Sequence, residues 1–184
     1  MVGALTPMPR LILLNGPPGI GKSTIARRFV DAHPLSLCLD VDVVRSLLGA
    51  WRDHPERAGR RARAIALEMA RAHLTAGHDV VIPQLLARPA FLDQLELLAA
   101  EVRVPFHELV LVAPRSAAIA RLQARSRDRS QAGEPDEPLT SEALDEVSDR
   151  LEALVALRPN AVPVSAPEGD LHGTYTRVLA AVSS

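Results

Sequence analysis

The amino-acid sequence predicts one α/β domain with a parallel β-sheet, and three observations support this prediction. The length of 184 residues suits a single domain. Hydrophobic residues make up 47% of the chain and charged residues 23%, which is close to the globular average and excludes disordered and fibrous chains. Short apolar runs alternate with longer segments of helical periodicity. Such alternation predicts parallel strands joined by right-handed crossovers.

The N-terminal half begins this alternation. Apolar runs predict strands at Leu11–Asn15, Leu37–Asp40 and Asp79–Pro83. Apolar residues at helical spacing predict helices at Lys22–Ala32, Val43–Leu48 and Arg57–Ala76. We expect the chain to leave helical geometry at Pro34 and Gly77, because proline lacks an N–H group and glycine readily adopts a left-handed conformation.

The C-terminal half continues the same pattern. It predicts strands at Phe106–Val112 and Ala161–Ser165, and helices at Pro89–Glu101, Ser116–Arg127, Ser141–Leu157 and Leu171–Val182. Residues 128–138 break the pattern, because they contain no large apolar side chain but include one glycine and two prolines. We expect this stretch to be an exposed loop.

Charge and cysteine content exclude several classes of protein. The formal net charge of −1 provides no overall electrostatic attraction to nucleic acid or to anionic lipid. The longest apolar runs, such as 109–113, are far shorter than the roughly 20 residues that span a bilayer, so no membrane span is expected. A single cysteine, Cys38, excludes an internal disulfide and favours a reducing cytoplasm. These features do not determine the oligomeric state.

Residues 16–23 match the phosphate-binding motif G-x-x-x-x-G-K-[ST] without a mismatch, between a predicted strand and a predicted helix. Glycines allow backbone N–H groups to approach phosphate oxygens, and the helix N-terminus adds positive partial charge. Lys22 is the only lysine of the chain, and it is expected to contact the β- and γ-phosphates of ATP. The hydroxyl of Ser23 is expected to bind Mg²⁺. The predicted ATP-binding residues are Gly16, Pro17, Pro18, Gly19, Ile20, Gly21, Lys22, Ser23 and Thr24.

With this motif the chain resembles the P-loop kinase-like phosphotransferases, a group that includes shikimate kinase, gluconate kinase, chloramphenicol phosphotransferase and the zeta-toxin kinases. The resemblance covers most of the chain in its layout, and its specific motifs are the P-loop and the two aspartates described next. It implies a three-layer α/β/α P-loop NTPase fold with a five-stranded parallel sheet in the order 2-3-1-4-5. It also implies ATP as the phosphoryl donor and a lid after the fourth strand.

Asp40 and Asp42 follow the second predicted strand, and ligands of open parallel sheets bind at the carboxyl ends of strands. Phosphoryl transfer uses carboxylates to hold Mg²⁺ and to accept the proton of the attacking hydroxyl. The D-x-D arrangement is similar to that of shikimate kinase, which implies that Asp40 lies on the metal side and that Asp42 is the base. Two structural alternatives remain open: Asp42 is also a good helix N-cap, and Asp40 can be purely structural.

Arg45 and Gln84 are the expected acceptor-binding residues beside Asp42. Arg45 resembles the acceptor-binding arginine of related D-x-x-R kinases, and a solvated helix arginine is the alternative. Gln84 follows the third predicted strand, where many P-loop proteins carry an acidic residue that helps to hold the metal. An amide can only exchange hydrogen bonds, so Gln84 is interpreted as an acceptor contact or as an ordinary loop residue.

Two arginine-rich segments complete the expected site. Residues 49–77 are predicted to cover the acceptor, and their arginines suggest an anionic acceptor or a nucleic-acid end, with a solvated helix face as the alternative. Arg121, Arg125 and Arg129 recur every four residues before the 128–138 loop. We expect a lid at about 121–140, in which Arg125 and Arg129 stabilise the transferring phosphoryl group. In the related kinases, adenine lies between the lid helix and the loop after the fifth strand, here residues 165–169.

The sequence therefore predicts a single-domain, ATP- and Mg²⁺-dependent kinase acting on a hydroxyl group of a small molecule, with Lys22, Asp42, Arg125 and Arg129 as catalytic residues. One alternative is a polynucleotide or nucleotide-sugar kinase, although a nucleic-acid partner is less favoured. A second alternative is a regulatory module that binds a nucleotide and transfers nothing. A transferase needs a base in the crevice and a plain switch does not, so Asp42 distinguishes these classes.

Overall fold

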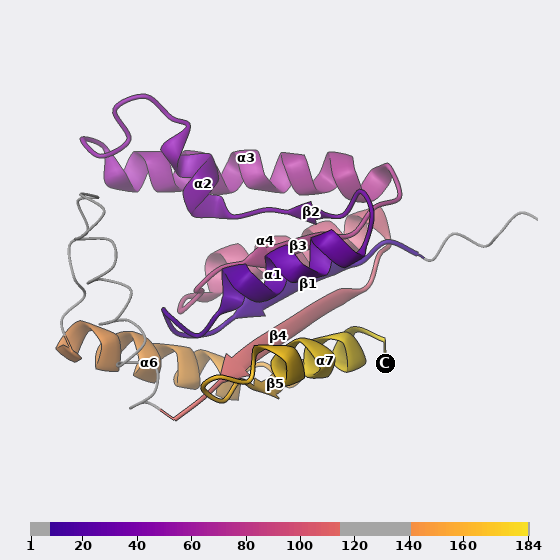
Figure 1. Cartoon of the computed structure of the whole chain (residues 1–184). Coiled ribbons are helices and arrows are strands. Elements are labelled where there is room, and N and C mark those ends of the chain that lie inside the picture. Colours follow the sequence, from indigo (N-terminus) through magenta and orange to yellow (C-terminus); the bar gives the residue numbers. More distant parts are fainter. Residues whose placement is uncertain (1–7, 115–140, 184) are drawn as a thin grey trace, which may run out of the picture.

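The computed structural model describes residues 8–114 and 141–183, which form a parallel five-stranded sheet with helices on both faces (Figure 1). The strand order is β2-β3-β1-β4-β5, and every neighbouring pair is parallel. This order confirms the fold expected from the resemblance. The strands are β1 (Leu11–Asn15), β2 (Leu37–Cys38), β3 (Val80–Pro83), β4 (Phe106–Val112) and β5 (Val162–Ser165).

Successive side chains of a strand point to opposite faces of the sheet. Helices cover both faces, so both sets of side chains are buried. In β1, Leu11 and Leu13 belong to one hydrophobic cluster, whereas Ile12 and Leu14 belong to the other. The first cluster packs under α2 (Val41–Ser46), α3 (Pro55–Thr75), α4 (Pro89–Val102) and α6 (Ser141–Ala156). The second packs under α1 (Lys22–Ala32) and α7 (Leu171–Val182).

The long helix α3 packs on the sheet through small side chains. Its buried face consists of residues spaced four apart, namely Ala58, Ala62, Ala66, Ala70 and Leu74. This spacing places them on one side of the helix. Their size allows α3 to lie close to its neighbours, while the arginines of its N-terminal half remain on other sides. The first residue of α3 is Pro55, a position where the missing N–H group has no cost.

The connection from β2 to α2 differs from the expectation. The strand ends at Cys38 rather than at Asp40, and the helix begins at Val41 rather than at Val43. The cause is Asp40, whose Oδ1 accepts a hydrogen bond of 2.9 Å from the N–H of Asp42 and caps the helix. The alternative in which Asp42 is the N-cap is therefore wrong, and Asp42 lies in the first turn.

The other described elements begin and end within two residues of their predicted bounds. The predicted helix at 116–127 and the lid at 121–140 lie outside the described residues. Within the part of the chain that the structure describes, no helix has the length and apolar character required to cross a bilayer.

Candidate active site

The loop between β1 and α1 requires glycine at three positions. Gly16, Gly19 and Gly21 have φ values of 141°, 77° and 99°, in a region that other residues rarely adopt. A Cβ atom at Gly16 would also lie 2.8 Å from the carbonyl oxygen of Leu111 on β4. The backbone of the motif is therefore held tightly against the sheet in a shape that depends on these glycines.

This loop has the features of an anion site at a helix N-terminus. The N-cap of α1 is Gly21, which has no side chain to cap the first-turn N–H groups. A Cβ atom placed on Gly21 would meet nothing within 4 Å, so the space beside the loop is open. Lys22 Nζ donates hydrogen bonds to the carbonyl oxygens of Gly16 (2.8 Å) and Pro17 (2.9 Å), which hold the ammonium against the loop. Backbone donors, the helix dipole and the ammonium together suit a phosphate chain.

Asn15 joins the start of the P-loop to the loop after β3. Its side chain is fully buried, and its Oδ1 accepts hydrogen bonds from the N–H groups of Gly16 (2.8 Å) and Leu86 (2.9 Å). Its Nδ2 donates to the carbonyl oxygen of Leu86 (3.0 Å). This residue was not predicted from the sequence, although an asparagine at the end of an apolar strand is a signal of a buried polar contact.

Three predicted acceptor residues come together at the end of β3. Arg45 forms an ion pair of 3.0 Å with Asp42 Oδ1, and the Gln84 amide nitrogen approaches Asp42 Oδ2 at 3.4 Å. The side chain of Asp42 is 59% exposed, so a ligand can reach it. The guanidinium of Arg45 also lies over the ring of Trp51, 4.9 Å from its centre, and Arg52 lies over the same ring at 4.4 Å.

The group formed by Asp42, Arg45 and Gln84, here called the Asp42 cluster, adjoins the P-loop. The N–H of Gln84 donates to the carbonyl oxygen of Leu14 (3.2 Å), next to the residue where the P-loop strand ends. In the sheet register, Pro83 of β3 is opposite Leu14 of β1. The carboxyl ends of these two strands therefore bring the Asp42 cluster and the phosphate loop to one edge of the sheet.

Two buried polar atoms of the cluster lack a partner. Arg45 Nε and Gln84 Oε1 have no hydrogen bond among residues 8–114 and 141–183. An unpaired buried polar atom costs free energy, so side chains of this kind fit a site that a ligand completes.

The donor set fits Mg²⁺ held with substrate phosphates rather than a metal held by protein alone. Among the described residues, no group of three or more His, Cys, Asp or Glu side chains could hold a metal ion. Ser23 lies exposed in the first turn of α1, and Asp40 is half-buried with one carboxylate oxygen in the α2 cap. Mg²⁺ takes few protein ligands and completes its shell with phosphate oxygens and water.

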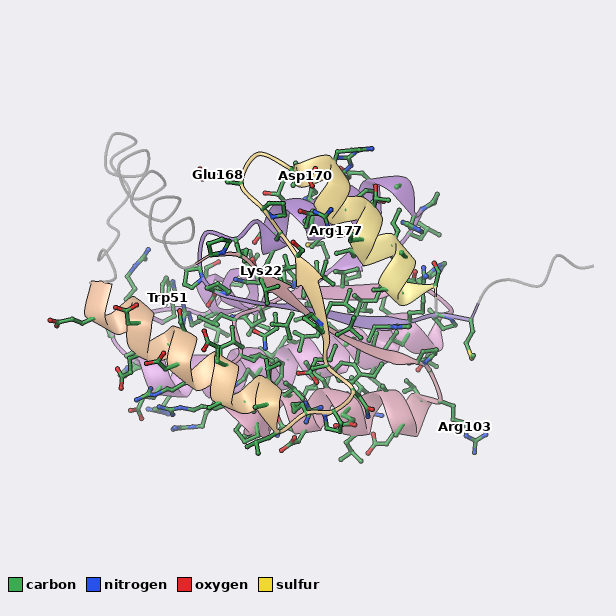
Figure 2. The ribbon with its side chains drawn as sticks, turned by 90° about the horizontal axis from the view of Figure 1, so that it is seen from below. Lys22, Trp51, Arg103, Glu168, Asp170 and Arg177 are labelled. Carbon is green, nitrogen blue, oxygen red and sulfur yellow. The ribbon has the colours of Figure 1, made fainter. Side chains whose placement is uncertain are left out.

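Arg177 fixes the loop between β5 and α7. It donates to the carbonyl oxygen of Ser165 (2.8 Å) and to Asp170 Oδ2 (2.8 Å), and Asp170 caps α7 through the N–H of Gly173. Figure 2 shows Asp170 and Arg177 side by side on this loop and helix. The hydrogen bond from Arg177 to the Asp170 carboxylate, and a second one from the Gly173 N–H, lower the pKa of Asp170 from its ordinary value of 3.8. The loop expected to contact adenine is thus held from both ends. The proposed lid arginines, Arg125 and Arg129, lie outside the described residues.

Comparison with known proteins places the chain among P-loop folds. A family model described as an AAA domain matches residues 11–154. A gluconokinase from Sinorhizobium meliloti 1021 shares 18% identity, with a TM-score of 0.65 over 96% of this chain and 93% of that one. A protein from Chloroflexus aurantiacus J-10-fl shares 16% identity, with a TM-score of 0.69 over 98% of each chain. A tunicamycin resistance protein from Deinococcus radiodurans shares 19% identity, with a TM-score of 0.59 over 95% of each chain. A comparison with curated proteins found no match.

Proposed function

Since this chain belongs to the AAA domain family, which matches residues 11–154, we propose that it is an ATP-dependent kinase acting on a hydroxyl group of a small molecule. The observation that carries the proposal is that the Lys22 loop and the Asp42 cluster adjoin at one edge of the sheet. A nucleotide-binding module that transfers nothing needs only the first of these, the Lys22 loop. The second supplies an exposed carboxylate beside the phosphate loop, which favours a transferase. The single cysteine still favours a reducing cytoplasm.

In the proposed reaction, the P-loop backbone and Lys22 bind the β- and γ-phosphates of ATP. Asp42 accepts the proton of the acceptor hydroxyl while the hydroxyl oxygen attacks the γ-phosphorus of ATP. The bond between the γ-phosphorus and the β-phosphate oxygen then breaks, and ADP leaves. Arg45 holds the Asp42 carboxylate in position and Gln84 supplies an amide for the acceptor. Mg²⁺ held by Ser23 and Asp40 with the phosphates would neutralise charge on the phosphate oxygens. Arg125 and Arg129 are proposed to close over the donor.

The nucleotide part of the proposal is tested at Lys22. Loss of one charge-assisted contact is worth roughly 1.5–3 kcal/mol, so Lys22→Ala is expected to weaken Mg·ATP binding by about 10-fold or more in calorimetry. Lys22→Arg keeps the charge but not the compact ammonium and should not restore affinity. Equal affinity in wild type and Lys22→Ala would refute the P-loop assignment.

The chemical part is tested at Asp42 after an acceptor has been found. ATP consumption would be screened against sugars, aminoglycosides and other antibiotics, nucleosides and RNA 5′-hydroxyl ends. With the best acceptor, Asp42→Asn is expected to lower turnover by about 10²-fold or more and to leave ATP affinity nearly unchanged. Asp31→Asn, an exposed acid at the end of α1, is the matched control and should keep full turnover. Full turnover in Asp42→Asn would refute Asp42 as the base, whereas a screen in which no acceptor raises ATP consumption would favour the regulatory module.

A further inference from the structure

A cavity of about 550 Å³ lies beside the Asp42 cluster, between the loop after α2 and the N-terminal half of α3. Its walls include Leu48, Trp51 and Ala64, together with Arg57, Arg60 and Arg61. The volume is within the range of roughly 300–1,000 Å³ that holds one small molecule. Figure 1 shows that this loop lies at the same end of the sheet as the turn between β1 and α1.

The cavity adjoins the proposed base through Trp51. The guanidinium of Arg45 lies over the Trp51 ring and at the same time pairs with Asp42. Trp51 is therefore shared between the cavity wall and the cluster that holds the carboxylate. Trp51 and Arg45 are thus the side chains that connect the cavity to Asp42.

The positive charge on this cavity is not balanced by nearby acids. Residues 49–64 contain five arginines but only two carboxylates, whereas the whole chain has a net charge of −1. Arg60 pairs with Glu56 at 3.8 Å, with both side chains mostly exposed. Within residues 8–114 and 141–183, no carboxylate forms an ion pair with Arg57 or Arg61.

Arg57 and Arg61 stand four residues apart on α3, so they are neighbours on the same side of the helix. Like charges at this spacing repel each other and destabilise a helix. A solvated helix face explains charged residues in general, but it does not explain why two unpaired arginines line a cavity. Two adjacent guanidinium groups match a phosphate group, which accepts paired N–H donors.

We propose that this cavity binds a phosphate-type oxyanion on the acceptor, so that the substrate is a small phosphorylated alcohol held by Arg57 and Arg61 with its free hydroxyl at Asp42. This inference rests on the proposed function, because it names the class of acceptor. Leu48 and Ala64 offer the apolar wall for the carbon body of the molecule. The cavity volume of about 550 Å³ has room for one small molecule, which disfavours a polynucleotide as the ligand.

Trp51 is the only tryptophan of the chain and it lines this cavity, so its fluorescence is a direct probe of binding there. The wild-type protein would be titrated with n-butyl phosphate and, at equal ionic strength, with butanol as the neutral match. Butyl phosphate is expected to change Trp51 fluorescence saturably and butanol is not. Binding should also weaken below about pH 6, where a phosphate monoester loses its second charge.

The variants separate this cavity from the phosphate loop. The double variant Arg57→Gln/Arg61→Gln is expected to weaken butyl phosphate binding by about 10-fold or more. Arg103→Gln, an exposed arginine far from Trp51 in Figure 2, is the matched control and should bind as the wild type does. Lys22→Ala should also retain the response, because the response does not depend on ATP.

Several results would overturn the proposal. These are an equal response to butanol, an unchanged affinity in the double variant, or a response lost in Lys22→Ala, which would place the oxyanion on the P-loop. A 5′-hydroxyl oligonucleotide that changes the fluorescence where butyl phosphate does not would assign the arginines to a nucleic-acid end instead. Failure of the kinase proposal appears separately, as absent ATP consumption with an intact response to butyl phosphate.

Discussion

Replacement of Asn15 by leucine should cost more stability than its small change in size suggests. Leucine has the same number and branching of side-chain heavy atoms as asparagine, so it opens no cavity. It leaves three buried backbone groups without their partner: the N–H of Gly16, and the N–H and carbonyl oxygen of Leu86. Each unpaired buried group costs roughly 1–3 kcal/mol, and local shifts recover part of this. We therefore expect Asn15→Leu to lower the free energy of unfolding by about 3–5 kcal/mol, a large part of the 5–15 kcal/mol of a typical domain.

Urea unfolding followed by Trp51 fluorescence measures this change. The matched control is Asn160→Ala, at an exposed asparagine in the turn before β5, where the expected change is within about 0.5 kcal/mol. Because the Asn15 contacts join the P-loop to the β3 side of the site, ATP affinity should also fall in Asn15→Leu. If both variants unfold at the same urea concentration with equal slopes, the contact between these two loops contributes nothing and the reasoning is refuted.

The remaining predictions concern the P-loop backbone and the α7 cap. Gly16→Ala should lower the free energy of unfolding by at least about 2 kcal/mol, because its Cβ would meet Leu111 and its φ is 141°. Gly59→Ala inside α3 should instead raise the free energy of unfolding by about 0.5–1 kcal/mol. Thermal melts in which both variants shift in the same direction would contradict this. The lowered pKa of Asp170 means that its carboxylate stabilises the fold above pH 3.8 and that this contribution is lost as pH falls through the lower folded value. Asp170→Asn should therefore be less stable than wild type near pH 7, and denaturant titrations from pH 7 to pH 3 should show the difference shrinking below about pH 4; a constant difference would show that charge is not involved.

The sequence was sufficient to predict the sheet and its phosphate loop. Both depend on local patterns: apolar runs for the strands, helical spacing for most helices, and a contiguous glycine motif for the loop. β1, β4, α1 and α7 begin and end where the sequence predicted. The strand order came from the resemblance rather than from these patterns, because pairing between strands is a non-local property.

The β2–α2 connection shows where local patterns failed. Asp40 and Asp42 are both good N-cap residues followed by apolar positions, so the sequence offers two helix starts. Tertiary packing decided between them, because a start at Val41 buries Val41 and Val44 in the core that α3 also joins. The carboxylate of Asp42 is then left exposed beside Arg45 and Gln84.

What the sequence determined by itself is the chemistry available: a P-loop with the chain's one lysine, two aspartates after the second strand, and an arginine-rich segment before the third. What only the tertiary structure decided is which of these groups meet. Asn15 contacts Leu86 across 71 positions of sequence, and Gln84 reaches Asp42 across 42. The pairing of Arg45 with Asp42 and Trp51, and the cavity beside them, likewise arise only when α2 packs against α3. Such contacts depend on the packing of whole elements, because no local pattern encodes the distance between residues far apart in the chain.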